Sequence, residues 1–462
     1  MRRRGHIFYS RIVLVLICLV MCLWSNLYAI GGSITEAEKS SLEVSARKSY
    51  IKRCNILDRN QKLLQESNVS EDGGVQTQTA DEYAHAHSIG YCSDTYGSYG
   101  LLKNIGERLY MDEDGDGIGD DLLLTIDSSV QSYVYQRIQN IAQTELATGI
   151  GVFVMKPNGE VLVNTAYPSF SCDAVSDLSK ASDYMNEEMA QKGDSFLNTN
   201  LQMTEPGSSF KIFDYAVIDE LGYRDEVYRD TGKINTGGFL LHNDSGAVYG
   251  DVTLDYALKK SVNTYFCHYM MKAGKYHISS YATAILGEES IATDFGNIKG
   301  QYHFLIKEDT VSEWELAIGQ NAIGQGGVLV SPAANAVMLN GLLTGKKVLP
   351  FEVQGTQPVD LWNGNPPVSD QTRKDLKNAL LKTADGYRIK NAVSGYQVLA
   401  KTGTASKGDG TTNAWIVSGL VKNGELKCVV VVMKAGTKEY GKSNRELLID
   451  VYKKLVSSGA CL

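Results

Sequence analysis

The sequence predicts an α+β fold, with a central antiparallel sheet enclosed by helices, behind an N-terminal membrane anchor and a small N-terminal domain. Three observations lead to this prediction: an arginine-flanked apolar segment at the start, a polar stretch over residues 31–120, and apolar hairpin patterns at both ends of the remaining chain. The expected parts are a tail and anchor (1–30), a small interaction domain (31–120) and a globular domain (121–462).

The first thirty residues have the pattern of an export segment. Arg2–Arg4 precede an apolar run from Ile12 to Trp24, which extends loosely to Ile30. This charge asymmetry predicts a single-pass protein of the cell membrane, with a cytoplasmic N-terminus and an extracytoplasmic body. Cleavage after Ala29 would place Leu27 where a small residue is preferred, so we expect an uncleaved anchor, with a cleaved signal peptide as the alternative.

Composition excludes nucleic acid as a partner and argues against structural zinc. The 462 residues carry a net charge of -8, with no basic stripe to neutralise phosphates. Cys267 and Cys428 lie in apolar runs and are expected to be buried hydrophobic residues. We expect a fold that does not depend on disulfides, and the pairing of the cysteines stays open. No zinc-site spacing occurs among the six cysteines beyond the anchor: Cys54, Cys92, Cys172, Cys267, Cys428 and Cys461.

An acidic, glycine-rich segment precedes the globular domain. Asp112, Asp114 and Asp116 occupy positions 1, 3 and 5 of a calcium-loop pattern, and Gly117 occupies position 6. Position 12 is Leu123, so the bidentate carboxylate of such a loop is missing. A turn between two strands is the favoured interpretation, and a calcium site is the weaker alternative. No other metal site is expected.

The globular domain begins with a strand, a helix and a hairpin. The apolar run Leu122–Ile126 predicts a short buried strand, and Asp127 is placed to cap the amphipathic helix that follows. Pro157-Asn158-Gly159 lies between the apolar runs 151–155 and 161–163, a pattern that predicts a hairpin.

The end of the chain predicts a second hairpin and a last helix. Lys422-Asn423-Gly424 lies between apolar runs over 415–421 and 426–433, and the second run is expected to be a central strand because it is apolar on both faces. Ser443 and Glu446 have the spacing of a capping box that opens a helix. Strands from both ends of this region are expected to form one sheet.

Ser208-Ser209-Phe210-Lys211 contains the residue types of an activated nucleophile. Ser208 follows a Pro-Gly pair and is expected at a helix start, where unsatisfied backbone N–H groups surround its hydroxyl. Lys211 lies on the same helix face. A lysine that is desolvated, or close to another cation, loses proton affinity and can act as the base for the serine. Taken alone, the pair is more often a capping serine beside a solvated lysine.

Ser261-Val262-Asn263 follows a helix predicted from Thr253. Ser261 can relay a proton between Lys211 and a leaving group, and the Asn263 amide can hold a peptide carbonyl of the substrate. In isolation this tripeptide also describes an ordinary turn at a helix end.

Lys401-Thr402-Gly403-Thr404 follows an apolar strand pattern. Lys401 brings positive charge, the two threonine hydroxyls can bind a substrate carboxylate, and Gly403 lets the substrate approach the backbone. Backbone N–H groups of Ser208 and Thr404 are the expected oxyanion hole. A solvated strand end is the ordinary alternative for this motif alone. The three motifs together, in this order, predict a serine acyl-transfer site.

The set S-x-x-K, S-x-N and K-T-G is shared by β-lactamases and penicillin-binding proteins. The chain resembles a class B penicillin-binding protein, a membrane-anchored peptidoglycan D,D-transpeptidase, of a compact type with a short N-terminal domain. Arg53–Asn60 is similar to the R-G-x-I-x-D-R-N segment of that class, with Cys54 in place of the glycine. Thr125–Asp127, Gly324–Gly326 and Ser331-Pro332 also match the class.

The resemblance implies a serine transpeptidase or β-lactamase-like fold that needs no cofactor. Ser208 would attack the penultimate D-Ala carbonyl of a peptidoglycan stem peptide ending in D-Ala-D-Ala, and an amine of a neighbouring stem would take the acyl group. β-Lactams would acylate the same serine. The class also implies a SEDS-type glycosyltransferase as partner. The acceptor amine, the β-lactam affinity, and a role in elongation, division or sporulation stay open.

Three other functions compete with this interpretation. A class A β-lactamase needs a carboxylate in a Glu-x-x-Leu-Asn segment, which the sequence lacks between the second and third motifs, and a class D enzyme has S-x-V where this chain has Asn263. A D,D-carboxypeptidase uses the same site with water as acceptor, and is the second choice. A β-lactam or muropeptide sensor, or a divisome scaffold, is the third.

Overall fold

The computed structural model describes residues 51–69, 75–93, 95–177, 179–192, 194–287, 289–303 and 310–461. The chain forms two compact units. The larger unit contains residues 54–109 and 121–462, and the smaller unit contains residues 110–120 and the segment that ends at Arg53. The predicted anchor lies outside the described residues, and no helix within them is long and apolar enough to cross a membrane. The domain boundary at residue 120 stays a prediction.

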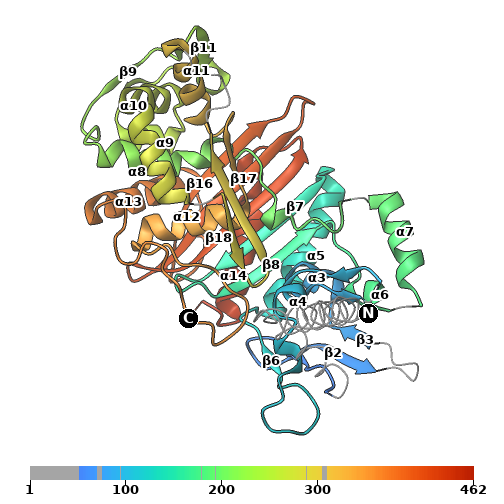
Figure 1. Ribbon diagram of the computed structural model, residues 1–462. Coiled ribbons are helices and arrows are strands. Elements are labelled where there is room, and N and C mark those ends of the chain that lie inside the picture. Colours follow the sequence, from blue (N-terminus) through green and yellow to red (C-terminus); the bar gives the residue numbers. More distant parts are fainter. Residues whose placement is uncertain are drawn as a thin grey trace, which may run out of the picture. The chain divides into compact units, whose positions relative to one another are not determined.

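A five-stranded antiparallel sheet is the centre of the larger unit (Figure 1). Its pairing of β18 with β7 joins strands from distant parts of the chain, as the sequence predicts. Strands β16 and β8 form the two edges of the sheet. In spatial order the strands are β16 (Gln397–Ser406), β17 (Thr412–Lys422), β18 (Glu425–Thr437), β7 (Gly149–Met155) and β8 (Val161–Tyr167).

Both predicted hairpins are present. Asn423 and Gly424 link β17 to β18 with φ of 52° and 82°, the left-handed conformation that matches the twist of a two-residue hairpin. Gly159, with φ of 98°, lies in the β7–β8 turn. Val429 to Val432 are fully buried in β18, as expected for a strand covered on both faces.

Helices α5 (Ser128–Glu145) and α14 (Arg445–Ser457) pack on one face of the sheet, in a single hydrophobic core with β7 and β18. Asp127 caps α5 as predicted, because its carboxylate accepts the N–H groups of Ser129 and Val130, each at 3.1 Å. Helix α12 (Pro332–Thr344) packs on β7 and β18.

The predicted capping box of the last helix is wrong. Ser443 lies in a short 3-10 turn, η5 (Gly441–Asn444), and α14 begins at Arg445 with Asn444 as its cap residue. The Asn444 side chain makes no capping bond and instead donates to the Ala414 carbonyl at 2.8 Å. Tertiary contacts therefore replace the local cap that the spacing predicted.

Four further helices of the larger unit determine where the motif residues lie: α8 (Lys211–Glu220), α9 (Leu254–Lys260), α10 (Asn263–Leu286) and α13 (Asp370–Gly386). Helix α13 packs on the edge strand β16 and contacts both α8 and α9. Helix α11 (Val311–Asn321) packs on α10.

Residues 54–109 belong to the same unit as the sheet. The predicted strand near residue 122 is present as β6 (Leu122–Leu123), in a separate four-stranded sheet of order β3-β2-β1-β6. Asp58, in the Arg53–Asn60 segment, accepts the N–H of Asn60 and of Lys62 and also the hydroxyl of Ser128 at 2.7 Å. This carboxylate therefore joins the β1–β2 turn to the start of α5.

The acidic segment forms a turn in the smaller unit. Oxygens of Asp112, Asp114 and Asp116 lie within 4.8 Å of one another. The Asp112 carboxylate accepts the N–H groups of Gly115, Asp116 and Gly117 at 2.7 to 3.2 Å. Backbone donors thus satisfy this carboxylate as in an ordinary turn, and calcium binding stays a prediction.

The remaining elements are short or peripheral: β1 (Ile56–Leu57), β2 (Leu63–Val69), β3 (Val75–Thr79), α3 (Glu82–Ile89), β4 (Cys92–Ser93), β5 (Gly97–Ser98), α4 (Leu101–Asn104), η1 (Arg108–Tyr110), α6 (Cys172–Ser176), α7 (Ala181–Lys192), η2 (Thr199–Leu201), η3 (Gly207–Phe210), β9 (Tyr228–Asp230), β10 (Lys233–Thr236), β11 (Phe239–His242), η4 (Asp244–Gly246), β12 (Gly250–Val252), β13 (Ser290–Thr293), β14 (Gly296–Tyr302) and β15 (Val328–Val330).

Candidate active site

The three motifs meet at the β16 edge of the sheet. Ser208 lies in the 3-10 turn η3, directly before α8, and not in the first α-helical turn that the sequence predicts. Lys211 is the first residue of α8 and is fully buried. Its Nζ lies 3.0 Å from Ser208 Oγ. The short turn therefore keeps the spacing of three residues that brings base and nucleophile together.

The second motif surrounds the Lys211 amine with acceptors. Nζ lies 3.0 Å from the Ser261 carbonyl oxygen, 3.2 Å from Ser261 Oγ and 2.5 Å from Asn263 Oδ1. A neutral amine has two N–H donors and one lone pair. Two of these acceptors can take the two N–H groups, which leaves the lone pair for the Ser208 proton.

The backbone of the second motif is strained at Ser261. Ser261 ends α9 with φ of 59°, in the left-handed region that non-glycine residues seldom adopt. The Asn263 amide donates to the His242 carbonyl at 3.0 Å while its oxygen faces Lys211. One N–H of that amide is therefore used within the protein, and the other remains for a substrate carbonyl.

The third motif brings a second lysine to the same serine. Lys401 is fully buried, and its Nζ lies 3.1 Å from Ser261 Oγ. Ser261 thus lies between two lysines. Thr402 Oγ1 donates to the Tyr387 hydroxyl at 3.0 Å, and Thr404 Oγ1 accepts the Gly441 N–H at 3.0 Å. Both threonines are half-buried.

The structure requires glycine at position 403 for packing within the protein, and not first for substrate access as the sequence suggests. A Cβ on Gly403 would lie 2.3 Å from the Pro206 carbonyl oxygen and 2.7 Å from the Ser209 nitrogen. A Cβ on Gly207 would lie 2.5 Å from the Thr404 carbonyl oxygen. The two glycines let β16 and the serine-bearing turn approach each other backbone to backbone, so the absence of side chains first serves packing within the protein.

Burial lowers the proton affinity of both lysines. Burial, together with the smaller effect of the positive charge of Lys401, lowers the pKa of Lys211 to about 7. Burial alone lowers the pKa of Lys401 to about 7. Near neutral pH the pair can hold one proton between them, with one lysine neutral as a base and the other charged as an anion anchor.

A buried carboxyl lies one turn beyond the base. Asp214 is fully buried, and neither of its oxygens has a hydrogen-bond partner within the described part of the chain. Burial raises its pKa well above the ordinary range, and the charge of Lys211 opposes this only in part. The neutral acid is therefore the favoured form in the folded protein.

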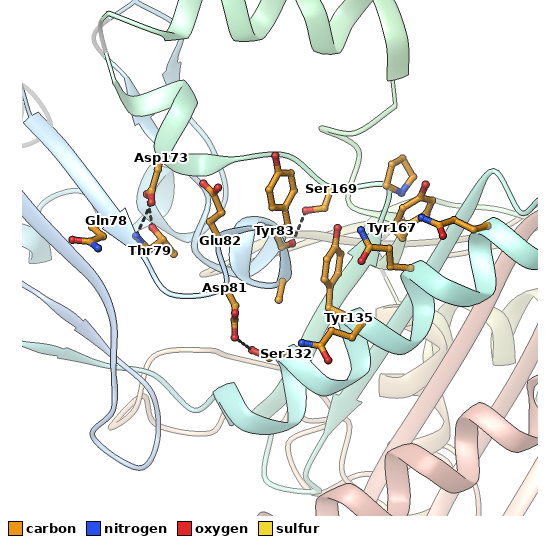
Figure 2. Close-up of a pocket in the computed structure, with 15 residues that line it drawn as sticks. Gln78, Thr79, Asp81, Glu82, Tyr83, Ser132, Tyr135, Tyr167, Ser169 and Asp173 are labelled. Carbon is orange, nitrogen blue, oxygen red and sulfur yellow. Dashed lines mark hydrogen bonds between the residues drawn. The ribbon is translucent and has the colours of Figure 1, made fainter.

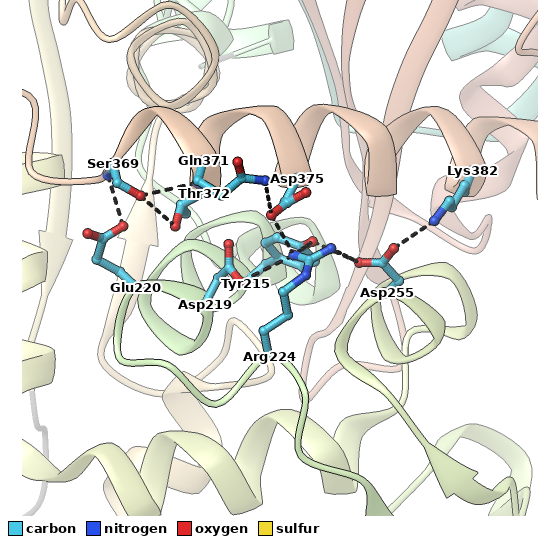
Figure 3. A network of polar contacts seen from close by, with 10 residues as sticks. All are labelled: Tyr215, Asp219, Glu220, Arg224, Asp255, Ser369, Gln371, Thr372, Asp375 and Lys382. Atoms are coloured by element: carbon cyan, nitrogen blue, oxygen red, sulfur yellow. Dashed lines mark hydrogen bonds and ion pairs between the residues drawn. The ribbon is translucent and has the colours of Figure 1, made fainter.

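A polar network fixes the helices behind the site (Figure 3). Arg224 donates to Asp219 of α8 at 3.2 Å and to Asp255 of α9 at 3.1 Å, and it forms an ion pair with Asp375 of α13 at 3.4 Å. The Tyr215 hydroxyl donates to Asp255 at 2.8 Å. The network therefore joins three helices: α8, which begins at Lys211, α9, which ends at Ser261, and α13, which is followed by Tyr387.

Every predicted catalytic and substrate-binding residue therefore lies in or beside one cluster. Sequence reasoning missed Asp214, Arg224, Tyr387 and Gly441. Asp214 lies three residues after Lys211 on one helix face, which is a local signal that could have found it. The other three act through contacts between segments far apart in the chain, so spacing gave no signal for them.

Comparison with known proteins decides the family. Residues 150–453 match the penicillin binding protein transpeptidase domain. The chain belongs to this family. The family expected from the three motifs is thereby confirmed, and the matched residues contain all three of them.

Individual penicillin-binding proteins are similar at low sequence identity. The peptidoglycan D,D-transpeptidase PbpA of Mycolicibacterium smegmatis is 24% identical over 390 residues, which are 76% of this chain and 78% of that protein. Penicillin-binding protein A of M. tuberculosis, in an imipenem acyl-enzyme complex, superposes with a TM-score of 0.77 at 20% identity over 89% of this chain and 99% of that one. A D,D-transpeptidase domain from Eggerthella lenta gives 0.74 at 20% identity, over 89% and 100%. The structural likenesses establish the fold.

Proposed function

We propose that this penicillin-binding protein is a peptidoglycan D,D-transpeptidase that works through an acyl-serine at Ser208. One observation carries the proposal: Lys211 Nζ lies 3.0 Å from Ser208 Oγ in a buried cluster where its pKa is about 7. A lysine with ordinary proton affinity would be charged at neutral pH and could not take the serine proton. Family membership and the similar D,D-transpeptidase support the same reaction.

The reaction follows from the contacts. Neutral Lys211 takes the Ser208 proton, and Oγ attacks the penultimate D-Ala carbonyl of a stem peptide. The backbone N–H groups of Ser208 and Thr404 hold the resulting oxyanion. Ser261 passes a proton to the leaving D-Ala nitrogen, and charged Lys401 with the Thr404 hydroxyl binds the terminal carboxylate. An amine of a second stem then attacks the acyl-serine and releases it.

The deciding experiment is an intact-mass measurement after incubation with penicillin. A single stable adduct in the wild-type protein, absent in Ser208→Ala and slow in Ser261→Ala, supports the acyl-serine. A donor pentapeptide offered with an amine acceptor then separates the functions: a cross-linked product supports transpeptidation, and water-only release of D-Ala makes the protein a carboxypeptidase. Rapid drug hydrolysis without an adduct would make it a β-lactamase.

We further propose that residues 12–24 anchor the protein in the cell membrane, with the catalytic domain outside the cytoplasm, and that its partner is a SEDS-type glycosyltransferase. The three arginines before the apolar run and the Arg53–Asn60 segment support this. Membrane fractionation of the full chain, compared with a chain beginning at residue 31, tests the anchor. Co-purification with a glycosyltransferase from detergent extracts tests the partner.

A further inference from the structure

Two cysteines are in contact within the hydrophobic core of the central sheet, and neither belongs to the three motifs. Cys428 lies in β18 and is fully buried, and Cys461 lies after α14 and is 2% exposed. Their sulfur atoms are 3.1 Å apart, although 33 positions separate them in the sequence. The S–S bond of a disulfide is about 2.05 Å long, so a movement of about 1 Å would bring the two sulfurs to bonding distance.

The turn after α14 brings Cys461 to the core. Gly459 has φ of 79°, the left-handed conformation that reverses the chain after a helix. The Ser458 hydroxyl accepts the Ala460 N–H at 3.3 Å. Ala460 and Cys461 consequently belong to the same hydrophobic core as Cys428. An ordered backbone therefore supports the contact between the two sulfurs.

The surroundings of the pair exclude a structural zinc site and a reactive single thiol. Structural zinc takes four protein ligands, and neither cysteine belongs to a group of three or more potential ligands within the described residues. Burial and the contact with Cys461 raise the pKa of Cys428 well above its ordinary value, so the folded protein holds little thiolate at this position. The chemistry left to two adjoining buried thiols is bonding to each other.

We propose that Cys428 and Cys461 are a disulfide-forming site that fastens the segment after α14 to β18. The oxidant is a small-molecule disulfide or the disulfide of a thiol oxidoreductase. The thiolate of one cysteine attacks this disulfide and releases a first thiol, and the other cysteine then attacks the mixed disulfide and releases a second thiol. The two protein sulfurs lose two electrons and two protons, which leave with the two released thiols. Because the core shields both sulfurs once it has formed, the exchange belongs to the folding of the chain.

The bond would act on a helix whose beginning contacts the catalytic edge of the sheet. Gly441, directly before α14, donates its N–H to Thr404 Oγ1 at 3.0 Å. The guanidinium of Arg445, the first residue of α14, donates to the Tyr387 carbonyl at 3.0 Å. A disulfide beyond the other end of α14 would oppose thermal loosening of this helix from the sheet. Disulfides persist mainly outside the cytoplasm, where the proposed anchor would place this domain, but the pairing itself rests on the geometry alone.

Refolding of the denatured, reduced full chain in detergent tests the site. One sample refolds with glutathione disulfide, and a second refolds with a reductant. Peptide mapping without reductant should give a fragment that links Cys428 to Cys461 in the first sample. The Tm of the oxidised protein should exceed that of the reduced protein by about 3–5 °C, because the bond restricts the unfolded chain across 33 positions. The oxidised protein should also retain penicillin acylation after a heating step that inactivates the reduced protein.

Two other buried thiols are matched controls. Cys172 precedes Asp173, which with Glu82 lines the cavity in Figure 2, and its thiol lies 3.9 Å from the Glu82 carbonyl oxygen. The Cys267 thiol donates to the Gly319 carbonyl at 3.3 Å. Cys172→Ala and Cys267→Ala should both keep the linked fragment and the difference in Tm between the oxidised and reduced samples.

Cys428→Ala and Cys461→Ala should each abolish the linked fragment and that difference in Tm. The comparison is made between two redox forms of the same variant, so a loss of stability caused by the substitution itself cancels. Complete alkylation of both cysteines after denaturing the oxidised wild-type protein would overturn the proposal. A bond from either cysteine to a different one, or equal Tm values for the two wild-type samples, would overturn it as well.

Discussion

The pH dependence of acylation tests the lysine pair directly. Acylation needs neutral Lys211 as the base and charged Lys401 as the anchor for the drug carboxylate. Burial lowers the pKa of each to about 7. The rate should therefore rise with pH as Lys211 loses its proton and fall as Lys401 loses its own, which gives a narrow bell centred near pH 7.

The expected magnitude follows from the two pKa values. At a pKa of about 7, each lysine is in its required form in about half of the molecules at pH 7, so about a quarter have both correct. At pH 6 or pH 8 the product falls to about 8%, a threefold drop, and at pH 5 or pH 9 to about 1%, a drop of about 25-fold. Because the two lysines interact, the apparent values belong to the pair.

The assay is the second-order rate constant of acylation by a fluorescent penicillin, which reports the free enzyme. A penicillin methyl ester is the matched control: without a carboxylate it does not need charged Lys401, so the alkaline limb should vanish while the acid limb remains. In Lys401→Met the acid limb should move to higher pH, because the charge that lowers the pKa of Lys211 is gone. A flat profile from pH 5 to 9 in folded protein would refute the reasoning.

Three further predictions concern residues around the cluster. Gly403→Ala should slow acylation by at least about 100-fold, because the new methyl would lie 2.3 Å from a carbonyl oxygen of the serine-bearing segment; Gly408→Ala, with open space around it, should have no effect in the same stopped-flow assay. Arg224→Gln should cost about 2–4 kcal/mol in a denaturant titration, since three carboxylates lose a shared partner. Arg229→Gln breaks only an exposed ion pair, and should leave the denaturation midpoint unchanged. Asp214 has a raised pKa in the folded protein, so wild-type stability should fall by about 1.4 kcal/mol per pH unit between the pKa of the unfolded carboxyl and that of the folded one. Asp214→Asn removes this loss, so the Tm of the variant relative to that of the wild type should increase from pH 5 to pH 8. A Tm difference that stays constant over this range would show that the Asp214 carboxyl has an ordinary pKa.

Local patterns in the sequence determined much of the fold. The hairpin through Asn423-Gly424 and the cap at Asp127 need only neighbouring residues, because turn chemistry and capping are set within a few positions. Ser208 and Lys211 were predictable as a pair for the same reason, since three residues on a helical turn bring side chains to one face. The capping box predicted at Ser443 shows the limit of such patterns, because the Asn444 side chain at the helix start donates instead to the distant Ala414 carbonyl.

The sequence by itself determined which residue types the site contains and in what order they occur. Only the tertiary structure decided that Ser261 lies between Lys211 and Lys401, residues 50 and 140 positions away from it. It also decided that both lysines are fully buried, and hence that their pKa values lie near 7. The physical reason is that the proton affinity of an amine depends on the water and the charges around it. Segments far apart in the sequence supply that environment, so residue spacing along the chain does not reveal it.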